Sequence, residues 1–142
     1  MKYLALDYGT RRVGVAVSDP DGMMAFPRRT LKREVREAFF AELLALIDEE
    51  RPDAIVLGYP LHTDGSECLT TRQVRNFAAS LKRRMALPLY WIDEALTSRQ
   101  AESDLREAGL SARAIKQVVD QQAAVRILET FLAQPENRRT PA

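Results

Sequence analysis

Carboxylates follow two of the short apolar runs that this sequence predicts to be strands. Asp7 ends the first run, and Asp93 and Glu94 follow the run Leu89–Ile92. In open α/β sheets, ligands gather at the carboxyl ends of parallel strands, so these acids would converge if the strands lie side by side. Carboxylate oxygens suit Mg²⁺ or Mn²⁺, and such ions would relieve the repulsion within the cluster. The alternative for each acid taken alone is a solvated loop residue.

A third acid, Asp120, lies in the last predicted helix among apolar or small neighbours, as on a helix face that packs against a sheet. A carboxylate on that face would be buried or cleft-facing and would need a partner. A metal ion shared with Asp7 and Glu94 would supply one. Because Asp120 directly follows Val119 of the apolar stripe, its position in the helix also allows an exposed side chain.

Small and basic residues surround the first acid. Gly9 and Gly14 flank Arg11 and Arg12, and glycine lets a phosphate or another backbone segment approach closely. Either arginine could hold a phosphate, so Gly9, Arg11 and Arg12 are candidates for substrate binding. A hairpin with a glycine turn explains Gly9 equally well.

The elements that must position these residues follow from hydrophobic periodicity. Two apolar runs joined by a short glycine-containing loop indicate a hairpin, and Pro27 in the next run indicates an edge strand or a bulge. The order β-β-β-α-β-α-β-α-α describes one α/β domain with an antiparallel N-terminal section. The expected strands are Tyr3–Asp7, Val13–Val17, Met23–Leu31, Ala54–Leu57 and Leu87–Ile92; the expected helices are Arg33–Arg51 (stripe Val35, Phe39, Leu43, Leu46, Ile47), a segment with Val74, Phe77, Leu81 and Met85 on one face, a segment from Thr97 or Ser98 to Gly109, and one that begins at Ser111.

Composition narrows the class of protein. The 142 residues fit one domain, and the net charge of +1 shows no basic excess of the kind that a strongly basic nucleic-acid binder carries. The single cysteine, Cys68, forms no internal disulfide and no cysteine zinc site. The chain does not begin like a signal peptide, and no apolar run approaches the ~20 residues that span a bilayer. We expect a cytoplasmic protein without membrane contacts, with residues 1–134 as its domain and 135–142 as a polar, frayed tail.

Four blocks of residues occur in an order that is more specific than any one of them. Together they resemble the motifs of the YqgF/RuvX family, which is named for Holliday junction resolvases and is also described as a nuclease of pre-16S rRNA. The resemblance spans about Leu4 to Leu132, and His62 stands where many relatives have Asn. The blocks are Asp7-x-Gly9-x-x-Arg12-x-Gly14-x-Ala16-x-Ser18-Asp19, Gly58-Tyr59-Pro60-Leu61-His62-Thr63-Asp64-Gly65-Ser66, Asp93-Glu94-Ala95-Leu96-Thr97-Ser98-x-x-Ala101 and Asp120-x-x-Ala123-Ala124-x-x-Ile127-Leu128.

The resemblance implies a ribonuclease-H-like α/β fold: a mixed sheet with an antiparallel N-terminal three-strand section and flanking helices. It implies that Asp7, Glu94 and Asp120 are the catalytic acids and the metal ligands. Asp93 takes a supporting role, since adjacent strand residues face opposite sides. The cofactor would be Mg²⁺ or Mn²⁺, with two ions that share Asp7, activate a water and stabilise the leaving 3′ oxygen.

Other residues are weaker candidates. Thr97 would cap a helix or orient Glu94, and His62 is a lone loop histidine. The segment Asp64–Ser66 is more typical of a turn and a helix cap than of a metal site, and Cys68 has no visible base to activate it. Basic residues between Arg28 and Arg36 would bind a phosphate backbone together with the first arginines if they share a face.

The hypothesis is therefore a metal-dependent nuclease of structured nucleic acid. RNA cleavage in 16S rRNA maturation ranks level with or slightly above resolution of branched DNA. Junction resolution usually takes a two-fold dimer, whereas RNA processing tolerates a monomer, and both states stay open. One alternative is a non-catalytic nucleic-acid-binding or ribosome assembly factor, which would not need all three acids. Another, a phosphotransferase of the actin/sugar-kinase group, needs two such domains, and 142 residues hold one.

Overall fold

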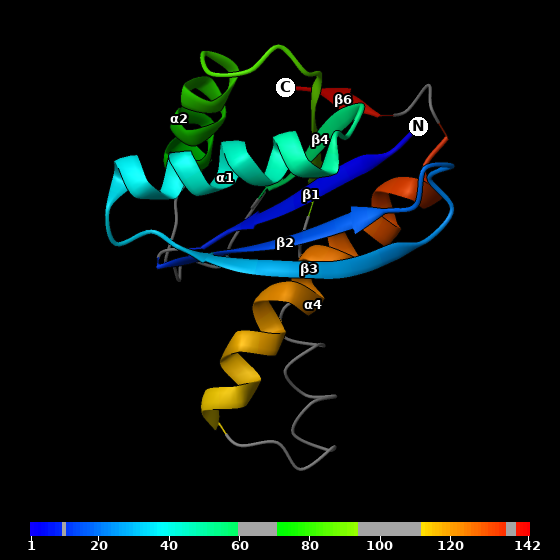
Figure 1. Ribbon diagram of the computed structural model, residues 1–142. Coiled ribbons are helices and arrows are strands. Elements are labelled where there is room, and N and C mark those ends of the chain that lie inside the picture. Colours follow the sequence, from blue (N-terminus) through cyan, green and yellow to red (C-terminus); the bar gives the residue numbers. More distant parts are fainter. Residues whose placement is uncertain (10, 60–70, 94–111, 136–138) are drawn as a thin grey trace.

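The computed structural model describes residues 1–9, 11–59, 71–93, 112–135 and 139–142. The expected helix between Thr97 and Gly109 lies outside these ranges. Within them the chain forms a six-stranded sheet and three helices (Figure 1). The elements are β1 Tyr3–Tyr8, β2 Arg12–Ser18, β3 Ala25–Lys32, α1 Arg36–Glu50, β4 Ala54–Tyr59, α2 Thr71–Lys82, β5 Leu89–Asp93, α4 Ala112–Ala133 and β6 Thr140–Pro141.

The sheet has the order β3-β2-β1-β4-β5-β6. β1, β2 and β3 form an antiparallel meander, whereas β1, β4 and β5 run parallel. This confirms the predicted mixed sheet with an antiparallel N-terminal section. Pro27 lies on the edge strand β3, and the register with β2 shifts between Val15 and Ala16, so both expected consequences of this proline are present.

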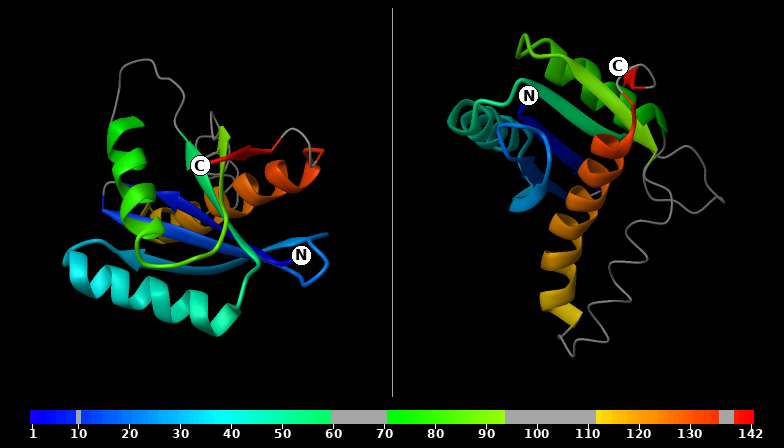
Figure 2. Two further views of the ribbon diagram at one scale, coloured as in Figure 1. Left: turned by 90° about the horizontal axis from the view of Figure 1, so that it is seen from above. Right: turned by 90° about the vertical axis from the view of Figure 1, so that its right-hand side faces the viewer.

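Helices α1 and α2 cover one face of the sheet, and α4 crosses the other (Figures 1 and 2). The alternation of β1 explains the two layers, because successive strand residues face opposite sides. Leu4 and Leu6 join the core under α1 and α2, while Tyr3 and Ala5 join the core under α4. The continuous apolar run of β4 is buried on both faces, as predicted.

Helix α1 is shorter than the expected Arg33–Arg51. Val35 precedes the first turn in an extended conformation and is exposed, so it does not belong to the apolar stripe. The helix ends where Arg51 adopts a left-handed conformation (φ 49°) and Pro52 follows. The remaining stripe residues are buried as expected: Phe39, Leu43, Leu46 and Ile47.

The segment after α4 differs from the frayed tail that the sequence predicted. Thr140–Pro141 form β6, which pairs antiparallel with β5, and the Ala142 amide donates to the Leu89 carbonyl at 2.8 Å. The Lys82 ammonium donates to the Ala142 carbonyl at 2.7 Å. The edge of β5 offers unpaired backbone groups, and these few residues satisfy them. No helix within the described ranges is long and apolar enough to cross a membrane.

Candidate active site

Asp7 lies at the carboxyl end of β1, on the face of the sheet that α4 covers. Tyr3 and Ala5 belong to the core of that face, and the two-residue alternation of the strand carries the same face to position 7. Asp7 is half-buried there. The predicted first acid is therefore placed beside a helix and not in an exposed loop.

Asp7 lies in a row of three residues that pair across neighbouring strands. This row defines the level of Asp7, meaning its position along the strand direction. Asp7 pairs with Gly14 of β2, and Gly14 pairs with Thr30 of β3. The Gln121 side-chain amide on α4 donates to the Thr30 hydroxyl at 3.3 Å. This contact brings the helical turn that contains Asp120 to the same level as Asp7.

The opposite ends of β1 and α4 support this alignment. The rings of Tyr3, at the start of β1, and Phe131, near the end of α4, meet edge to face at 5.2 Å. Helix α4 thus runs antiparallel to β1, and its earlier turns lie toward the carboxyl end of the strand (Figure 1). Its buried stripe of Ala123, Ala124, Ile127, Leu128 and Phe131 has a helical period that continues back to position 120.

The parallel strands bring a third segment to this edge. Leu6 pairs with Leu57 of β4, and the next residue along β4, Gly58, pairs with Ile92 of β5. Ile92 belongs to the core under α4. Alternation would carry the same face to position 94, two residues further on, but Glu94 lies outside the described residues.

The structure therefore places part of the predicted acid set. It brings the backbone of the Asp120 turn to the level of Asp7, whereas the side chains of Asp93 and Asp120 are not described. His62, Thr97, Cys68 and the segment Asp64–Ser66 also lie outside the described ranges. Among the described residues, no three His, Cys, Asp or Glu side chains form a group that could hold a metal ion. The catalytic and metal-ligand assignments stay predictions.

The hairpin between β1 and β2 is held to β3 by its backbone. The Gly9 amide donates to the Arg12 carbonyl at 2.9 Å, and the Arg33 amide donates to the Arg11 carbonyl at 2.9 Å. The Arg33 guanidinium also donates to the Gly9 carbonyl. These contacts fix the glycine that follows Asp7 by two residues, so Gly9 has a structural role whether or not it contacts substrate.

A cavity of about 510 Å³ opens beside this hairpin. Four of its five lining residues are basic: Arg11, Arg12, Lys32 and Arg33, with Glu34 as the fifth. We call it the hairpin cavity. Arg11 and Arg12, the candidates that the sequence suggested for phosphate binding, both line it.

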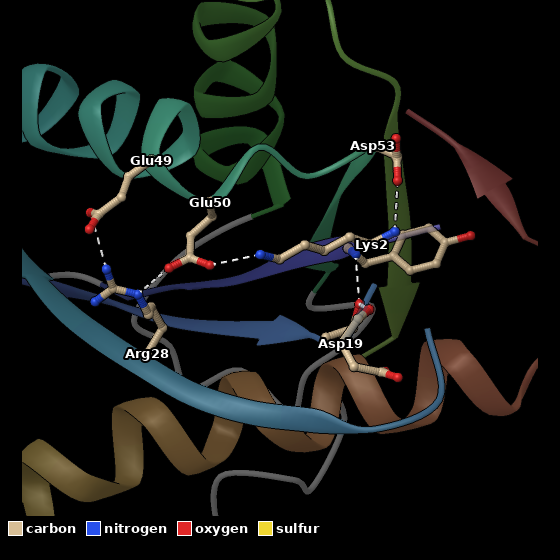
Figure 3. Close-up of polar contacts among 8 residues, drawn as sticks. Lys2, Asp19, Arg28, Glu49, Glu50 and Asp53 are labelled. Carbon is tan, nitrogen blue, oxygen red and sulfur yellow. Dashed lines mark hydrogen bonds and ion pairs between the residues drawn. The ribbon is translucent and has the colours of Figure 1, made fainter. Parts of the chain in front are cut away.

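Arg28 does not belong to this basic group. Its guanidinium pairs with Glu49 at 3.1 Å and also with Glu50, and Lys2 reaches Glu50 from the other side at 2.9 Å (Figure 3). The hydrogen bond from Arg28 is the main cause that holds the pKa of Glu50 below its usual value. Two carboxylates thus already pair with Arg28, and it does not line the hairpin cavity, so its place in the phosphate-binding set stays a prediction.

A second cavity lies on the face of the sheet that α1 and α2 cover, opposite the face of Asp7. The sequence did not predict this cavity. It measures about 250 Å³ and lies between the end of β1 and helices α1 and α2. Tyr8 faces it, since it follows Asp7 and points the other way. Burial raises the pKa of the Tyr8 hydroxyl above its ordinary value, against the opposing effect of Arg33 and Arg36. The sequence signal that could have indicated this cavity is helical spacing, which puts Gln73, Asn76 and Ser80 on one face of α2.

The sequence matches the family model RuvX, described as Holliday junction resolvase, over residues 1–134. A protein of Nitratidesulfovibrio vulgaris (strain Miyazaki F) is 63% identical over the whole of both chains. A protein of Koribacter versatilis is 41% identical, covering 92% of this chain and 86% of its own. Both relatives carry the name "Putative pre-16S rRNA nuclease".

The fold is similar to that of solved RuvC structures. Thermus thermophilus RuvC in complex with Holliday junction substrate superposes with a TM-score of 0.61, covering 100% of this chain and 99% of its own at 16% identity. A second Thermus thermophilus RuvC structure gives a TM-score of 0.60. This similarity in fold confirms the predicted ribonuclease-H-like architecture.

Proposed function

The chain belongs to the RuvX family and is a nuclease, and we propose that it hydrolyses phosphodiester bonds of structured RNA during maturation of the 16S rRNA precursor. The observation that carries the proposal is the row from Asp7 through Gly14 to Thr30, across which Gln121 aligns α4. That alignment supports a shared role for Asp7 and Asp120. The names of the curated relatives favour RNA as the substrate.

The chemistry of the proposed donor set suits a divalent metal ion. Asp7 is half-buried on a face that is otherwise lined by Ala5, Ile92 and Ala124. A second carboxylate at the same level would repel it unless a cation lay between them. Asp7 and Asp120, together with Glu94, would hold Mg²⁺ or Mn²⁺, whose hard character suits carboxylate oxygens. When bound, such ions supply an activated water and stabilise charge on the leaving oxygen.

The basic hairpin cavity supplies the substrate-binding part of the proposal. Arg11, Arg12, Lys32 and Arg33 attract the phosphate backbone without reading its sequence. Arg33 is also hydrogen-bonded to the hairpin, so a strand held there is positioned relative to β1 and its terminal Asp7. Positioning and charge neutralisation are the main contributions that a protein makes to phosphoryl transfer.

The test is the Asp7→Asn variant, which keeps the size of the side chain and removes its charge. Wild type and variant are incubated with labelled 16S rRNA precursor in Mg²⁺, Mn²⁺ or EDTA. We expect wild-type cleavage that EDTA abolishes, and loss of at least about 10³-fold in the variant. Asp48→Asn, an exposed acid on α1 that lies on the other face, serves as the matched control and should cleave normally.

Two results would contradict this function. Cleavage at the wild-type rate by Asp7→Asn would show that Asp7 is not a catalytic residue. Cleavage unaffected by EDTA would show that the reaction does not depend on a metal ion. If the wild type binds precursor but cleaves nothing under any metal condition, the chain is the non-catalytic binding factor considered above. The cytoplasmic location stays a prediction.

Resolution of a four-way junction is the second candidate, favoured by the description of the family model and by the fold shared with RuvC. It requires two active sites related by a two-fold axis. A labelled junction in the same assay, with light scattering on the protein alone, separates the candidates. Symmetric cleavage of the junction by a dimer would favour this function over RNA processing.

A further inference from the structure

The cavity between β1, α1 and α2 gathers positive charge around one hydroxyl, and we call it the Ser80 cavity. Ser80 is almost fully buried. Its hydroxyl accepts hydrogen bonds from Arg36 at 3.0 Å and from Arg83 at 3.1 Å, and its carbonyl accepts one from Arg84 at 2.8 Å. Three guanidinium groups therefore contact a single residue; Arg36 is also among the residues that line the cavity, whereas Arg83 and Arg84 are not.

Nothing in the described part of the chain neutralises these three cations. Arg36, Arg83 and Arg84 form no ion pair with any described carboxylate, in contrast to Arg28, which contacts two. Like charges only a few ångströms apart repel one another. An anion bound among them would convert that repulsion into charge-assisted hydrogen bonds.

Aromatic rings hold the guanidinium groups in fixed planes. Arg84 lies over the Phe40 ring at 4.1 Å and Arg36 over the same ring at 5.4 Å. Arg33 lies over the Tyr8 ring at 4.1 Å, and that ring stacks on Phe77 at 4.1 Å. A guanidinium fixed by its face presents the N–H groups of its edge, which is the geometry that binds phosphate in a bidentate manner.

The remaining polar wall suits the same ligand. Gln73 and Asn76 are exposed on α2 and line the cavity together with Arg33 and Arg36. Their amides donate hydrogen bonds and bring no negative charge. Among the described residues that line the Ser80 cavity there is no aspartate or glutamate, so this part of the site combines several hydrogen-bond donors with two arginines, Arg33 and Arg36.

We propose that the Ser80 cavity binds a backbone phosphate of the nucleic-acid strand that runs past Asp7. This inference rests on the proposed nuclease function. Arg33 lines both the hairpin cavity and the Ser80 cavity, so the two basic sites are adjacent. Asp7 and Tyr8 are consecutive and face opposite sides of the sheet. A nucleic-acid strand that crosses the end of β1 is thus cleaved on the face of the sheet under α4. The Ser80 cavity binds its phosphate on the face under α1 and α2.

The test measures binding without cleavage. Fluorescein-labelled single-stranded RNA and DNA of one sequence are titrated with the full chain in EDTA, and anisotropy gives Kd. Arg36→Gln and Arg84→Gln, singly and combined, should weaken binding, by about tenfold in the double variant. The slope of log Kobs against log salt should fall in magnitude by about 0.7 for each lost phosphate contact. The loss should be equal for RNA and DNA, because phosphates carry no base information.

The matched control is Arg51→Gln, an exposed arginine beyond the other end of α1 and about 22 Å from Arg36 by the rise of the helix. It should bind as the wild type does. Wild-type affinity and salt slope in the Arg36/Arg84 double variant, confirmed as folded by circular dichroism, would overturn the proposal. An equal loss of affinity in Arg51→Gln would also overturn the proposal, because the loss would then follow from the change in net charge and not from the Ser80 cavity.

Two further arms identify the ligand and separate this inference from the catalytic one. Millimolar uridine 5′-monophosphate should leave the strand bound, and displacement at micromolar concentration would overturn the proposal in favour of a free nucleotide site. In EDTA, Asp7→Asn should bind at least as tightly as the wild type, because it removes a negative charge beside the strand while no cation is present. If the arginine variants lose affinity while Asp7→Asn still cleaves, the phosphate site stands and the assignment of Asp7 fails.

Discussion

Replacing Gly9 by alanine tests whether the hairpin between β1 and β2 holds the predicted active centre in place. Gly9 lies two residues after Asp7, and its amide closes the turn by donating to the Arg12 carbonyl at 2.9 Å. Its own carbonyl accepts a hydrogen bond from Arg33. A change at this glycine therefore acts on the acid and on two of the basic residues beside it.

The size of the effect follows from one contact. A Cβ at position 9 would lie 2.7 Å from the Arg12 carbonyl oxygen, whereas ordinary contact begins near 3.4 Å. Backbone must therefore move by about 0.7 Å, at a cost of ~1–3 kcal/mol for overpacking. Alanine offsets ~0.4–1 kcal/mol of this loss in the free energy of unfolding, because it restricts the conformations of the unfolded chain. A net loss of about 1.5 kcal/mol corresponds to a fall in Tm of about 5 °C for a chain of this length.

The expected loss of activity is larger than the loss of stability suggests. A displacement of 1 Å near reacting groups can cost about 10²-fold in rate, so we expect the turnover of Gly9→Ala to fall at least about tenfold well below its Tm. The assay is cleavage of labelled 16S rRNA precursor in Mg²⁺, with calorimetry giving Tm on the same samples.

Gly22→Ala is the matched control. Gly22 has φ +68°, and a Cβ there would lie 2.8 Å from the Met1 carbonyl oxygen, so this change is also destabilising. It lies in the turn between β2 and β3, at the opposite end of the sheet from Asp7, and should lower Tm while leaving turnover intact. Equal losses of activity in both variants, or wild-type Tm and turnover in Gly9→Ala, would refute the reasoning.

Three further changes test other parts of the structure. Ser18→Ala removes the buried hydroxyl that accepts the Tyr3 amide at 2.8 Å, and denaturant titration should show a loss of ~1–3 kcal/mol. Glu50→Gln should narrow its Tm difference from wild type as pH falls below 4.5, since the stabilisation from a lowered pKa is complete above the ordinary value and is lost progressively as the pH falls toward the lowered one; a constant difference would contradict a lowered pKa of Glu50. Deletion of residues 139–142 should lower Tm and promote aggregation through the uncovered edge of β5; unchanged melting and solubility would count against a role for β6.

Local patterns were sufficient to predict five of the six strands, β1 to β5. Alternation and turn residues indicated the hairpin of β1 and β2, and Pro27 indicated the edge and the irregular register of β3. They were insufficient for β6, because Thr140 and Pro141 have no strand pattern and pair only where β5 leaves backbone groups open. Val35 fitted a helical stripe by spacing alone, yet the chain enters α1 after it, so its side chain never reaches the core.

The candidate site was predictable at the level of single strands and not at the level of packing. The place of Asp7 at the end of β1 follows from the sequence. Its level relative to α4 depends on the contact between Gln121 and Thr30, which are far apart in the chain. Ser80 likewise contacts Arg36, the first residue of α1, and Arg83 and Arg84, which follow α2, and only the folded chain brings them to one serine.

The net charge of +1 gave no sign of nucleic-acid binding, and the distribution of charge in the fold explains why. Acids such as Glu49 and Glu50 neutralise Arg28 away from the two cavities, so they lower the sum without weakening the basic sites. The hairpin cavity and the Ser80 cavity share Arg33, and among the described residues that line them only Glu34 is acidic. Local potential, and not net charge, governs how fast a charged strand arrives. Association should therefore depend steeply on salt even though the whole chain is nearly neutral.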